Sequence, residues 1–435
     1  MTRERARWLG VVEGYYGPPL PQAARLDLIR WMGDHGFTCY GYAPKDDPYH
    51  RARWREPYPA DRMDEFAAML ATGREAGVEV ALVVSPGLDW RDGDEEALAA
   101  KLVTFRDLGA RVLGVAWDDV PAGGAELGHA HGHAVAVAAG AVGDGVDWIT
   151  CPTDYSGMGV TPYLRAYVDA LPPGAEVMWC GPGIVSPHVS EAEIREFTSE
   201  LGRPVLFAEN FPVNDGAMAG VLHLGPYPRR DPGIVEHSTG VFCNLMSLPI
   251  ASRIGLGVAA RWWQDPHGDR ERHWREVIDE VPGLLPLARA SRSWVGAVGV
   301  DDELAAWVDA ALAGDVGALR AYLFAGCRDG VPPGLAAEVE PWLEQWDRET
   351  QAMQYAINLI ELRPAKPAEI AFAVGELWRR ARFREQQLFG IRWAAYPVTV
   401  RTANGFDVRP DAVVEGDNLT DVLCRAAIDG VSSRG

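Results

Sequence analysis

Long hydrophobic runs, paired cysteines and lysine-rich stretches are all missing from this sequence. No stretch of 18 or more consecutive apolar residues occurs, so we expect no segment that spans a membrane. The six cysteines include no C-x-x-C pair, and Cys39, Cys151, Cys180 and Cys243 fall inside apolar runs, which favours buried free thiols in a reducing compartment. The first ten residues, MTRERARWLG, lack the apolar centre of a secretory signal. Together these absences predict a cytoplasmic location.

Positive charge is also in short supply. The chain has 41 Lys and Arg against 61 Asp and Glu, which gives a formal net charge of −20 at pH 7. Such a surface repels polyanions, so we expect no nucleic-acid partner, no anionic membrane and no polyanionic polysaccharide as substrate. The contents of hydrophobic residues, 48%, and of charged residues, 23%, are those of an ordinary globular protein.

The first part of the chain alternates between short apolar runs and longer amphipathic stretches. The amphipathic stretches, which include 21–36, 61–77, 94–109 and 190–202, have the length of helices and several end in Gly. Repeated strand–helix alternation over about 260 residues predicts an α/β fold, a (β/α)8 TIM-like barrel over residues 1–266. The eight predicted strands are 8–14, 38–45, 78–87, 112–120, 147–155, 175–183, 204–211 and 240–246.

The pattern changes at about residue 267. From there to about residue 390 the apolar residues recur with a helical period, which predicts an all-α helical domain. The tail, 391–435, is ambiguous, and we expect a short strand near 397–402 and a last helix near 417–428.

Polar side chains gather where the predicted strands end. The stretch VLGVAWDDV, residues 112–120, ends in two adjacent carboxylates, Asp118 and Asp119, and like charges side by side cost free energy. In a (β/α)8 barrel these ends form one face, and that face holds the active site. The other polar residues at strand ends are Glu13, Lys45, Asp46, Asp47, Ser85, Asp89, Asp154, Tyr155, Asn210, Asp215 and Asn244.

Adjacent carboxylates suit one kind of glycosidase chemistry. In most glycosidases the two carboxyl groups flank the bond from opposite sides, which neighbours in sequence cannot easily do. Asp118 and Asp119 fit a sugar with an N-acetyl group, because its own carbonyl oxygen can attack the anomeric carbon and form an oxazoline. One aspartate then orients the acetamido N–H, and the other protonates the leaving group.

Taken alone, these residues have other interpretations. The aspartate pair is also consistent with carboxylates that cap the next helix, Lys45 with a solvated charge, and Tyr155 with an aromatic side chain at the barrel rim. The run GHAHGHA, 128–134, puts histidines at alternate positions and raises the alternative of a metal-dependent hydrolase. We expect this run to begin a helix on the outside of the barrel and therefore expect no metal site; its histidines are His129, His131 and His133.

Several motifs together resemble glycoside hydrolase family 84, the β-N-acetylglucosaminidases that include protein O-GlcNAcases and enzymes once called hyaluronidases. They appear in the family's order and span residues 10 to about 263. The motifs are GVVEGYYGPP (10–19), YAPKDDPYHRARWREPYP (42–59), SPGLDW (85–90), WDDV (117–120), CPTDY (151–155), WCGP (179–182) and NFPVND (210–215).

The resemblance implies a retaining exo-β-N-acetylglucosaminidase that uses substrate-assisted catalysis and needs no cofactor. It implies that Asp118 polarises the acetamido group and that Asp119 is the general acid and base. The substrate would be a glycoside, glycan or glycoprotein that contains N-acetylglucosamine. Apart from the resemblance, dimerisation is one of the roles open to the helical domain, which would make the protein a homodimer. The implied substrate-binding residues are Gly14 through its backbone carbonyl, Lys45, Tyr155, Asn210, Asp215 and Asn244.

One position departs from the family pattern. The family usually has Trp two residues before the pocket asparagine, where this chain has Ala208. The loss of ring contact would be about 1–3 kcal/mol if nothing replaces it. The alternative to an active enzyme is therefore a weakened or inactive glycan-binding barrel. Among the sixteen Trp, Trp263 is the candidate for lining the pocket.

Overall fold

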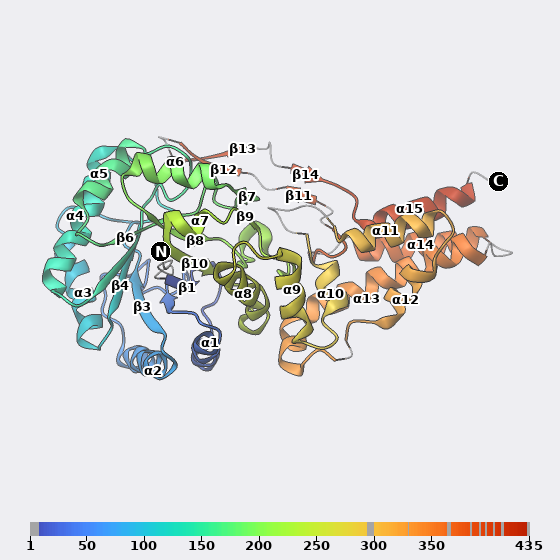
Figure 1. Cartoon of the computed structure of the whole chain (residues 1–435), viewed down its shortest axis with the longest axis horizontal. Coiled ribbons are helices and arrows are strands. Elements are labelled where there is room, and N and C mark those ends of the chain that lie inside the picture. Colours follow the sequence, from blue (N-terminus) through green and yellow to red (C-terminus); the bar gives the residue numbers. More distant parts are fainter. Residues whose placement is uncertain are drawn as a thin grey trace.

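The computed structural model describes residues 8–293, 300–328, 330–362, 367–382, 385–390, 393–395, 398–402, 405–409 and 413–432. A barrel lies at one end of the molecule, and a bundle of helices from the later part of the chain lies at the other (Figure 1). None of the helices in these ranges is long and apolar enough to cross a membrane.

Eight parallel strands close into a barrel, which confirms the predicted fold. Their order around the barrel is β1-β10-β8-β6-β5-β4-β3-β2. Each strand therefore lies beside the next one along the chain, and the last pairs with the first, as in a (β/α)8 barrel. The strands are β1 (Trp8–Glu13), β2 (Cys39–Tyr42), β3 (Glu79–Val84), β4 (Val112–Ala116), β5 (Asp147–Cys151), β6 (Glu176–Trp179), β8 (Val205–Glu209) and β10 (Ser238–Asn244).

Helices follow the strands and cover the barrel, and all four amphipathic stretches named from the sequence are helical. The helix after the sixth barrel strand has a complete capping box between Ser190 and Glu193 and ends at Gly202 in the left-handed conformation. The helices are α1 (Gln22–Asp34), α2 (Ala60–Ala76), α3 (Glu95–Asp107), α4 (Ala125–Val142), α5 (Pro162–Ala170), α6 (Glu191–Leu201), α7 (Ile234–His237) and α8 (Pro249–Gln264).

Short secondary-structure elements lie in the loops that follow β6 and β8. β7 (His188–Val189) and β9 (Arg229–Arg230) form a two-stranded parallel sheet, and η1 (Gly216–Met218) is a single 3-10 turn. Sequence periodicity gave no signal for β7 and β9, since two residues are too few to show alternation.

The region after the barrel is helical, as predicted. Glu338 of α13 accepts hydrogen bonds from the N–H groups of Ile250 and Ala251 at the start of α8, which ties the helical region to the barrel. The helices are α9 (Arg270–Asp279), α10 (Leu285–Ala290), α11 (Asp302–Leu312), α12 (Gly317–Ala325), α13 (Pro333–Leu362), α14 (Pro367–Arg382) and α15 (Leu419–Ser432). The domain boundaries at 266 and 390 stay predictions.

The tail contains both predicted elements, a short strand and a last helix. β12 (Val398–Thr402) pairs antiparallel with β13 (Gly405–Arg409), and β11 (Trp393–Ala395) pairs with β14 (Val413–Glu415). The final helix α15 packs on α13 and α14.

Side chains that point inward fill the lower part of the barrel. Gly10 has no side chain there because a Cβ would lie 2.5 Å from the ring of Phe242, so the aromatic ring takes the space above the glycine. The inner cluster comprises Trp8, Cys39, Ala81, Val112, Ile149, Leu206 and Phe242.

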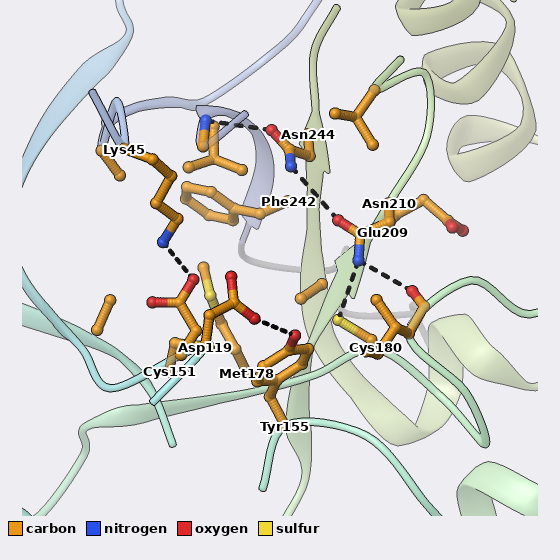
Figure 2. Close-up of a pocket in the computed structure, with 18 of the residues that line it drawn as sticks. Lys45, Asp119, Cys151, Tyr155, Met178, Cys180, Glu209, Asn210, Phe242 and Asn244 are labelled. Atoms are coloured by element: carbon orange, nitrogen blue, oxygen red, sulfur yellow. Dashed lines mark hydrogen bonds and ion pairs between the residues drawn. The ribbon is translucent and has the colours of Figure 1, made fainter. Parts of the chain in front are cut away.

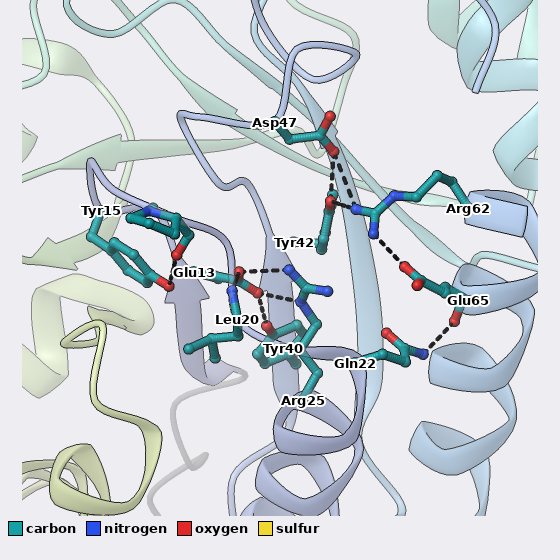
Figure 3. A network of polar contacts seen from close by, with 12 residues as sticks. Glu13, Tyr15, Leu20, Gln22, Arg25, Tyr40, Tyr42, Asp47, Arg62 and Glu65 are labelled. Carbon is teal, nitrogen blue, oxygen red and sulfur yellow. Dashed lines mark hydrogen bonds and ion pairs between the residues drawn. The ribbon is translucent and has the colours of Figure 1, made fainter. Parts of the chain in front are cut away.

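Glu13 does not reach the barrel mouth, where the sequence suggested that polar strand ends would gather. Its buried carboxylate accepts hydrogen bonds from Arg25 Nε, at 2.7 Å, and from the hydroxyl of Tyr40 (Figure 3). Successive side chains of a strand point to opposite faces. Val12 faces the barrel interior, so Glu13 faces α1.

Candidate active site

A cavity of about 510 Å³ opens where the barrel strands end. All eight site residues expected from the sequence line it, namely Gly14, Lys45, Asp118, Asp119, Tyr155, Asn210, Asp215 and Asn244. Figure 2 shows several of them pointing toward one another across the cavity from different strands. The fold therefore brings together residues that are up to 230 positions apart in the chain.

The two carboxylate oxygens of Asp118 differ in their partners. Its Oδ2 forms an ion pair with the Lys45 ammonium. Burial raises the pKa of this carboxyl, but the charge and hydrogen bond of Lys45, together with Arg51, outweigh burial and hold the pKa below its usual range. The other oxygen, Oδ1, is buried and has no hydrogen-bond partner. An ionised acceptor without a donor is unusual in a protein interior, and this one belongs to a residue that lines the cavity.

Asp119 has a different environment although it is the next residue. Its Oδ1 accepts a hydrogen bond from the Tyr155 hydroxyl at 2.7 Å, and its Oδ2 accepts one from the Tyr16 hydroxyl at 2.8 Å. The backbone of Asp119 has a φ of 54°, in the left-handed region that costs a residue with a side chain about 1–3 kcal/mol. Strain of this kind persists only where the surroundings hold it.

Tyr16 joins the acid pair to the opposite wall of the cavity. While its hydroxyl binds Asp119, its backbone N–H donates to Asp215 Oδ2 at 2.7 Å. Burial raises the pKa of Asp215, and the nearby charge of Asp119 raises it further. The sequence prediction missed Tyr16, although it lies in the quoted motif GVVEGYYGPP.

Two asparagines form a chain along the third side. Asn244 Oδ1 accepts from the Gly14 N–H at 3.1 Å, and Asn244 Nδ2 donates to Asn210 Oδ1 at 3.4 Å. Asn210 Nδ2 in turn donates to the carbonyl of Ile184 at 2.9 Å. These hydrogen bonds fix the orientations of the two side-chain amides. The carbonyl oxygen of Gly14 takes no part in this series of hydrogen bonds.

The floor of the cavity is apolar and contains sulfur. Cys151, Met178, Cys180 and Phe242 lie beneath the polar ring (Figure 2). Ala208 also lines the cavity, so the position where the family usually has Trp contributes a single methyl group to the wall. An apolar floor under a polar ring suits a ligand with one apolar substituent among several hydroxyls.

Trp263 does not line the cavity, so its candidacy from the sequence was wrong. It is buried on α8, and its Nε1 donates to the Tyr227 hydroxyl at 3.2 Å. Its helical position directs it into the core between α8 and the barrel wall, where its N–H finds a partner.

The histidine run does not converge. His131 is buried and stacks on Trp117, with ring centroids 3.9 Å apart, while its Nδ1 lies 2.8 Å from the Tyr163 hydroxyl. His129 and His133 are exposed on the same helix and stack on each other. Within the described part of the chain, no three side chains of the metal-binding types gather at one point.

A family model described as beta-N-acetylglucosaminidase matches residues 9–293, which is more than half of the 435 residues. The chain belongs to this family. The matched range of the β-N-acetylglucosaminidase model contains every residue of the cavity and all of the barrel except Trp8, the first residue of β1. The resemblance to glycoside hydrolase family 84 is thereby confirmed.

Curated relatives and solved structures agree with the family. The protein O-GlcNAcases of Rattus norvegicus and Mus musculus are each 30% identical over 272 residues, 59% of this chain and 30% of theirs. The chain thus spans less than a third of the length of these relatives.

Two solved structures share the fold. A mutant of the O-GlcNAc hydrolase of Thermobaculum terrenum superimposes with a TM-score of 0.82 at 23% identity, covering 98% of this chain and 94% of that one. CpGH84B gives a TM-score of 0.78 at 24% identity, covering 87% of this chain and 74% of that one.

Proposed function

We propose that this protein is a retaining exo-β-N-acetylglucosaminidase that hydrolyses terminal β-linked N-acetylglucosamine through an oxazoline intermediate. The observation that carries the proposal is that two adjacent carboxylates with different partners line one cavity: Asp118 pairs with the Lys45 ammonium, and Asp119 accepts hydrogen bonds from two tyrosine hydroxyls. A carboxylate held ionised by Lys45 is suited to accept the N–H of an acetamido group.

In the first step the substrate supplies its own nucleophile. Asp118 accepts the acetamido N–H, which increases electron density on the acyl oxygen. That oxygen attacks the anomeric carbon as the bond to the leaving oxygen breaks, and a cyclic oxazolinium forms that Asp118 stabilises. Tyr155 supports this step when its single O–H donor turns from Asp119 Oδ1 to the acyl oxygen.

Asp119 supplies and recovers the proton. It protonates the leaving oxygen in the first step and, as a carboxylate, takes a proton from the water that opens the oxazoline in the second step. The acyl oxygen attacks the anomeric carbon opposite the leaving oxygen, and water then attacks opposite the acyl oxygen, so two inversions leave the product in the β configuration. The hydrogen bond from Tyr16 keeps the Asp119 carboxyl oriented between the two steps.

The remaining polar groups suit the hydroxyls of a terminal sugar. Asp215 and the chain of Asn210 and Asn244 lie across from the acid pair. The Lys45 ammonium has three N–H donors, of which one binds Asp118 and the others can bind a hydroxyl. The backbone carbonyl of Gly14 supplies a further acceptor. The natural substrate class is a glycoside, glycan or glycoprotein that ends in N-acetylglucosamine.

The decisive assay compares chromogenic glycosides with and without the acetamido group. We expect release from the N-acetylglucosaminide and none from the matching glucoside, because only the former carries the nucleophile. Asp118→Asn should lower kcat by about 100-fold or more. The matched control is Asp46→Asn, an exposed aspartate next to Lys45. Efficient hydrolysis of the glucoside would refute the mechanism.

The second candidate is a glycan-binding barrel without turnover, and Ala208 is the observation that favours it. Its small side chain leaves the wall beside Asn210 without an aromatic ring. Tight binding of N-acetylglucosamine in calorimetry, with no release of product from any N-acetylglucosaminide, would establish this candidate in place of the enzyme.

A further inference from the structure

Asp119 departs from the strand alternation that places its neighbour Asp118 in the cavity. On β4, Val112 belongs to the inner cluster, so Asp118, six residues later, points inward by the two-residue period. Trp117 points outward and stacks on His131 of α4. Asp119 should then point outward as well, yet it lines the cavity beside Asp118.

The left-handed backbone explains how both neighbours reach one cavity. With a φ of 54° at Asp119, the chain turns away from strand geometry and its side chain swings to the inner side. A residue with a Cβ adopts this conformation at a cost in free energy, so something must hold the peptide there.

Arg51 is the group in contact with this peptide. Its Nη2 donates to the carbonyl oxygen of Asp119 at 3.2 Å and lies 3.5 Å from that of Asp118. The guanidinium also lies 5.9 Å from the ring centre of Tyr16, whose hydroxyl binds Asp119. Arg51 is buried, with 6% of its surface exposed, so its position is fixed by packing.

Residues 43–59, the segment between β2 and α2, carry Arg51 to this place, and Lys101 anchors that segment. The buried Lys101 ammonium on α3 donates to the carbonyls of Tyr49, Trp54 and Glu56 at 2.7, 2.8 and 2.8 Å. These three acceptors lie on both sides of Arg51 in the sequence, so a single cation holds the chain before and after it.

We propose that Arg51 is a positioning residue, which holds the left-handed peptide at Asp119 so that the second carboxylate faces the same cavity as the first. Arg51 acts on Asp119 more than on Asp118, because Asp118 faces inward by strand alternation and has its own ion pair with Lys45. Lys101 supports this role by fixing the 43–59 segment. The inference rests on the proposed function only where activity is the measurement.

The test uses leaving-group dependence, which a general loss of folded protein would not change. For Arg51→Met we expect kcat/KM to fall on the order of 100-fold with an alkyl N-acetylglucosaminide, which needs a proton from Asp119. With an activated dinitrophenyl N-acetylglucosaminide the fall should be less than roughly tenfold. Arg53→Met is the matched control, because Arg53 lies in the same segment and pairs with Glu56 at the surface; it should leave both values unchanged.

Two further variants complete the design. Arg51→Met combined with Asp119→Ala should be no slower than Asp119→Ala alone, because residues that act as a unit are not additive. If Arg51→Met does not fold, Arg51→Lys carries the same test, because lysine keeps the charge but lacks the planar fork of donors. Equal losses on both glycosides, or losses in the double variant that multiply, would overturn the inference.

Failure of the proposed function would be recognised separately. If the unmodified protein cleaves neither glycoside, the enzyme assignment fails and the role of Arg51 is read from a crystal structure of Arg51→Met. We then expect a negative φ at residue 119 and the carboxylate of Asp119 away from Tyr155. An unchanged left-handed peptide at Asp119 would overturn the inference.

Discussion

His131 makes the barrel sensitive to mild acid, and the size of this effect follows from its surroundings. The imidazole lies between Trp117 and Tyr163 on the inner side of α4. Burial lowers its pKa from 6.5 to about 3, because the stacked ring excludes water from the charged form. The unfolded chain exposes this group and binds a proton near the ordinary pKa.

The sign follows from proton linkage. Below pH 6.5 the unfolded state binds a proton that the folded state does not, so stability falls as pH decreases from 6.5 toward the folded pKa. Each pH unit in this window costs about 1.4 kcal/mol, so at about pH 5 the single histidine costs about 2 kcal/mol. Above pH 6.5, the pKa of His131 in the unfolded chain, this loss of stability is absent.

Urea unfolding of His131→Phe, at about pH 7 and about pH 5, isolates this contribution. Phenylalanine keeps the stack on Trp117 but cannot be protonated, and it removes the imidazole partner of the Tyr163 hydroxyl, which costs about 1 kcal/mol at both pH values. The variant should therefore lose about 2 kcal/mol less than the unmodified protein between the two conditions. His129→Phe, an exposed position on the same helix, is the control and should follow the unmodified protein. If His131→Phe also loses as much stability as the unmodified protein, the buried neutral imidazole is refuted.

Two other predictions concern carboxylates that lie outside the cavity, the buried Glu13 and the half-buried Glu338. Glu13→Gln leaves the Arg25 guanidinium buried without its counter-charge and should cost about 3–5 kcal/mol in urea unfolding. Glu56→Gln, which breaks the exposed pair with Arg53, should leave the unfolding midpoint almost unchanged; equal costs for the two variants would contradict the argument from burial. Glu338→Ala removes the acceptor for two N–H groups at the start of α8 and should cost about 1–2 kcal/mol by the same measurement, while an unchanged midpoint would mean that water replaces the cap.

The strands of the barrel could be predicted because parallel strands are buried on both faces and read as apolar runs. The predicted runs extend past the strands at their carboxyl ends. The run 175–183, for example, contains a strand only at Glu176–Trp179. The excess residues are those that leave the sheet to line the cavity, such as Cys180. The same overextension that made the strand boundaries wrong therefore marks the residues of the candidate site.

Alternation explains why some strand-end residues were predicted correctly and Glu13 was not. Gly14, Asn210 and Asn244 each follow an inner-cluster residue or Val12 by an even number of positions, so they face the cavity. Glu13 lies an odd number away and faces α1. Whether a residue lies an odd or an even number of positions from an inward-facing residue can be counted in the sequence. This count would have distinguished Glu13 from the cavity residues, whereas polarity alone did not.

What sequence could not supply is the difference between the two neighbouring acids. Asp118 receives the Lys45 cation, which comes from the loop after β2. Asp119 receives two tyrosine hydroxyls, which come from the loops after β1 and β5. Two carboxyl groups perform different tasks only when their environments differ, and here every distinguishing partner lies at least 36 positions away in the chain. Two adjacent aspartates in a sequence thus predict chemistry at a place, but the division of that chemistry between them depends on the closed barrel that brings three other strand ends to the same mouth.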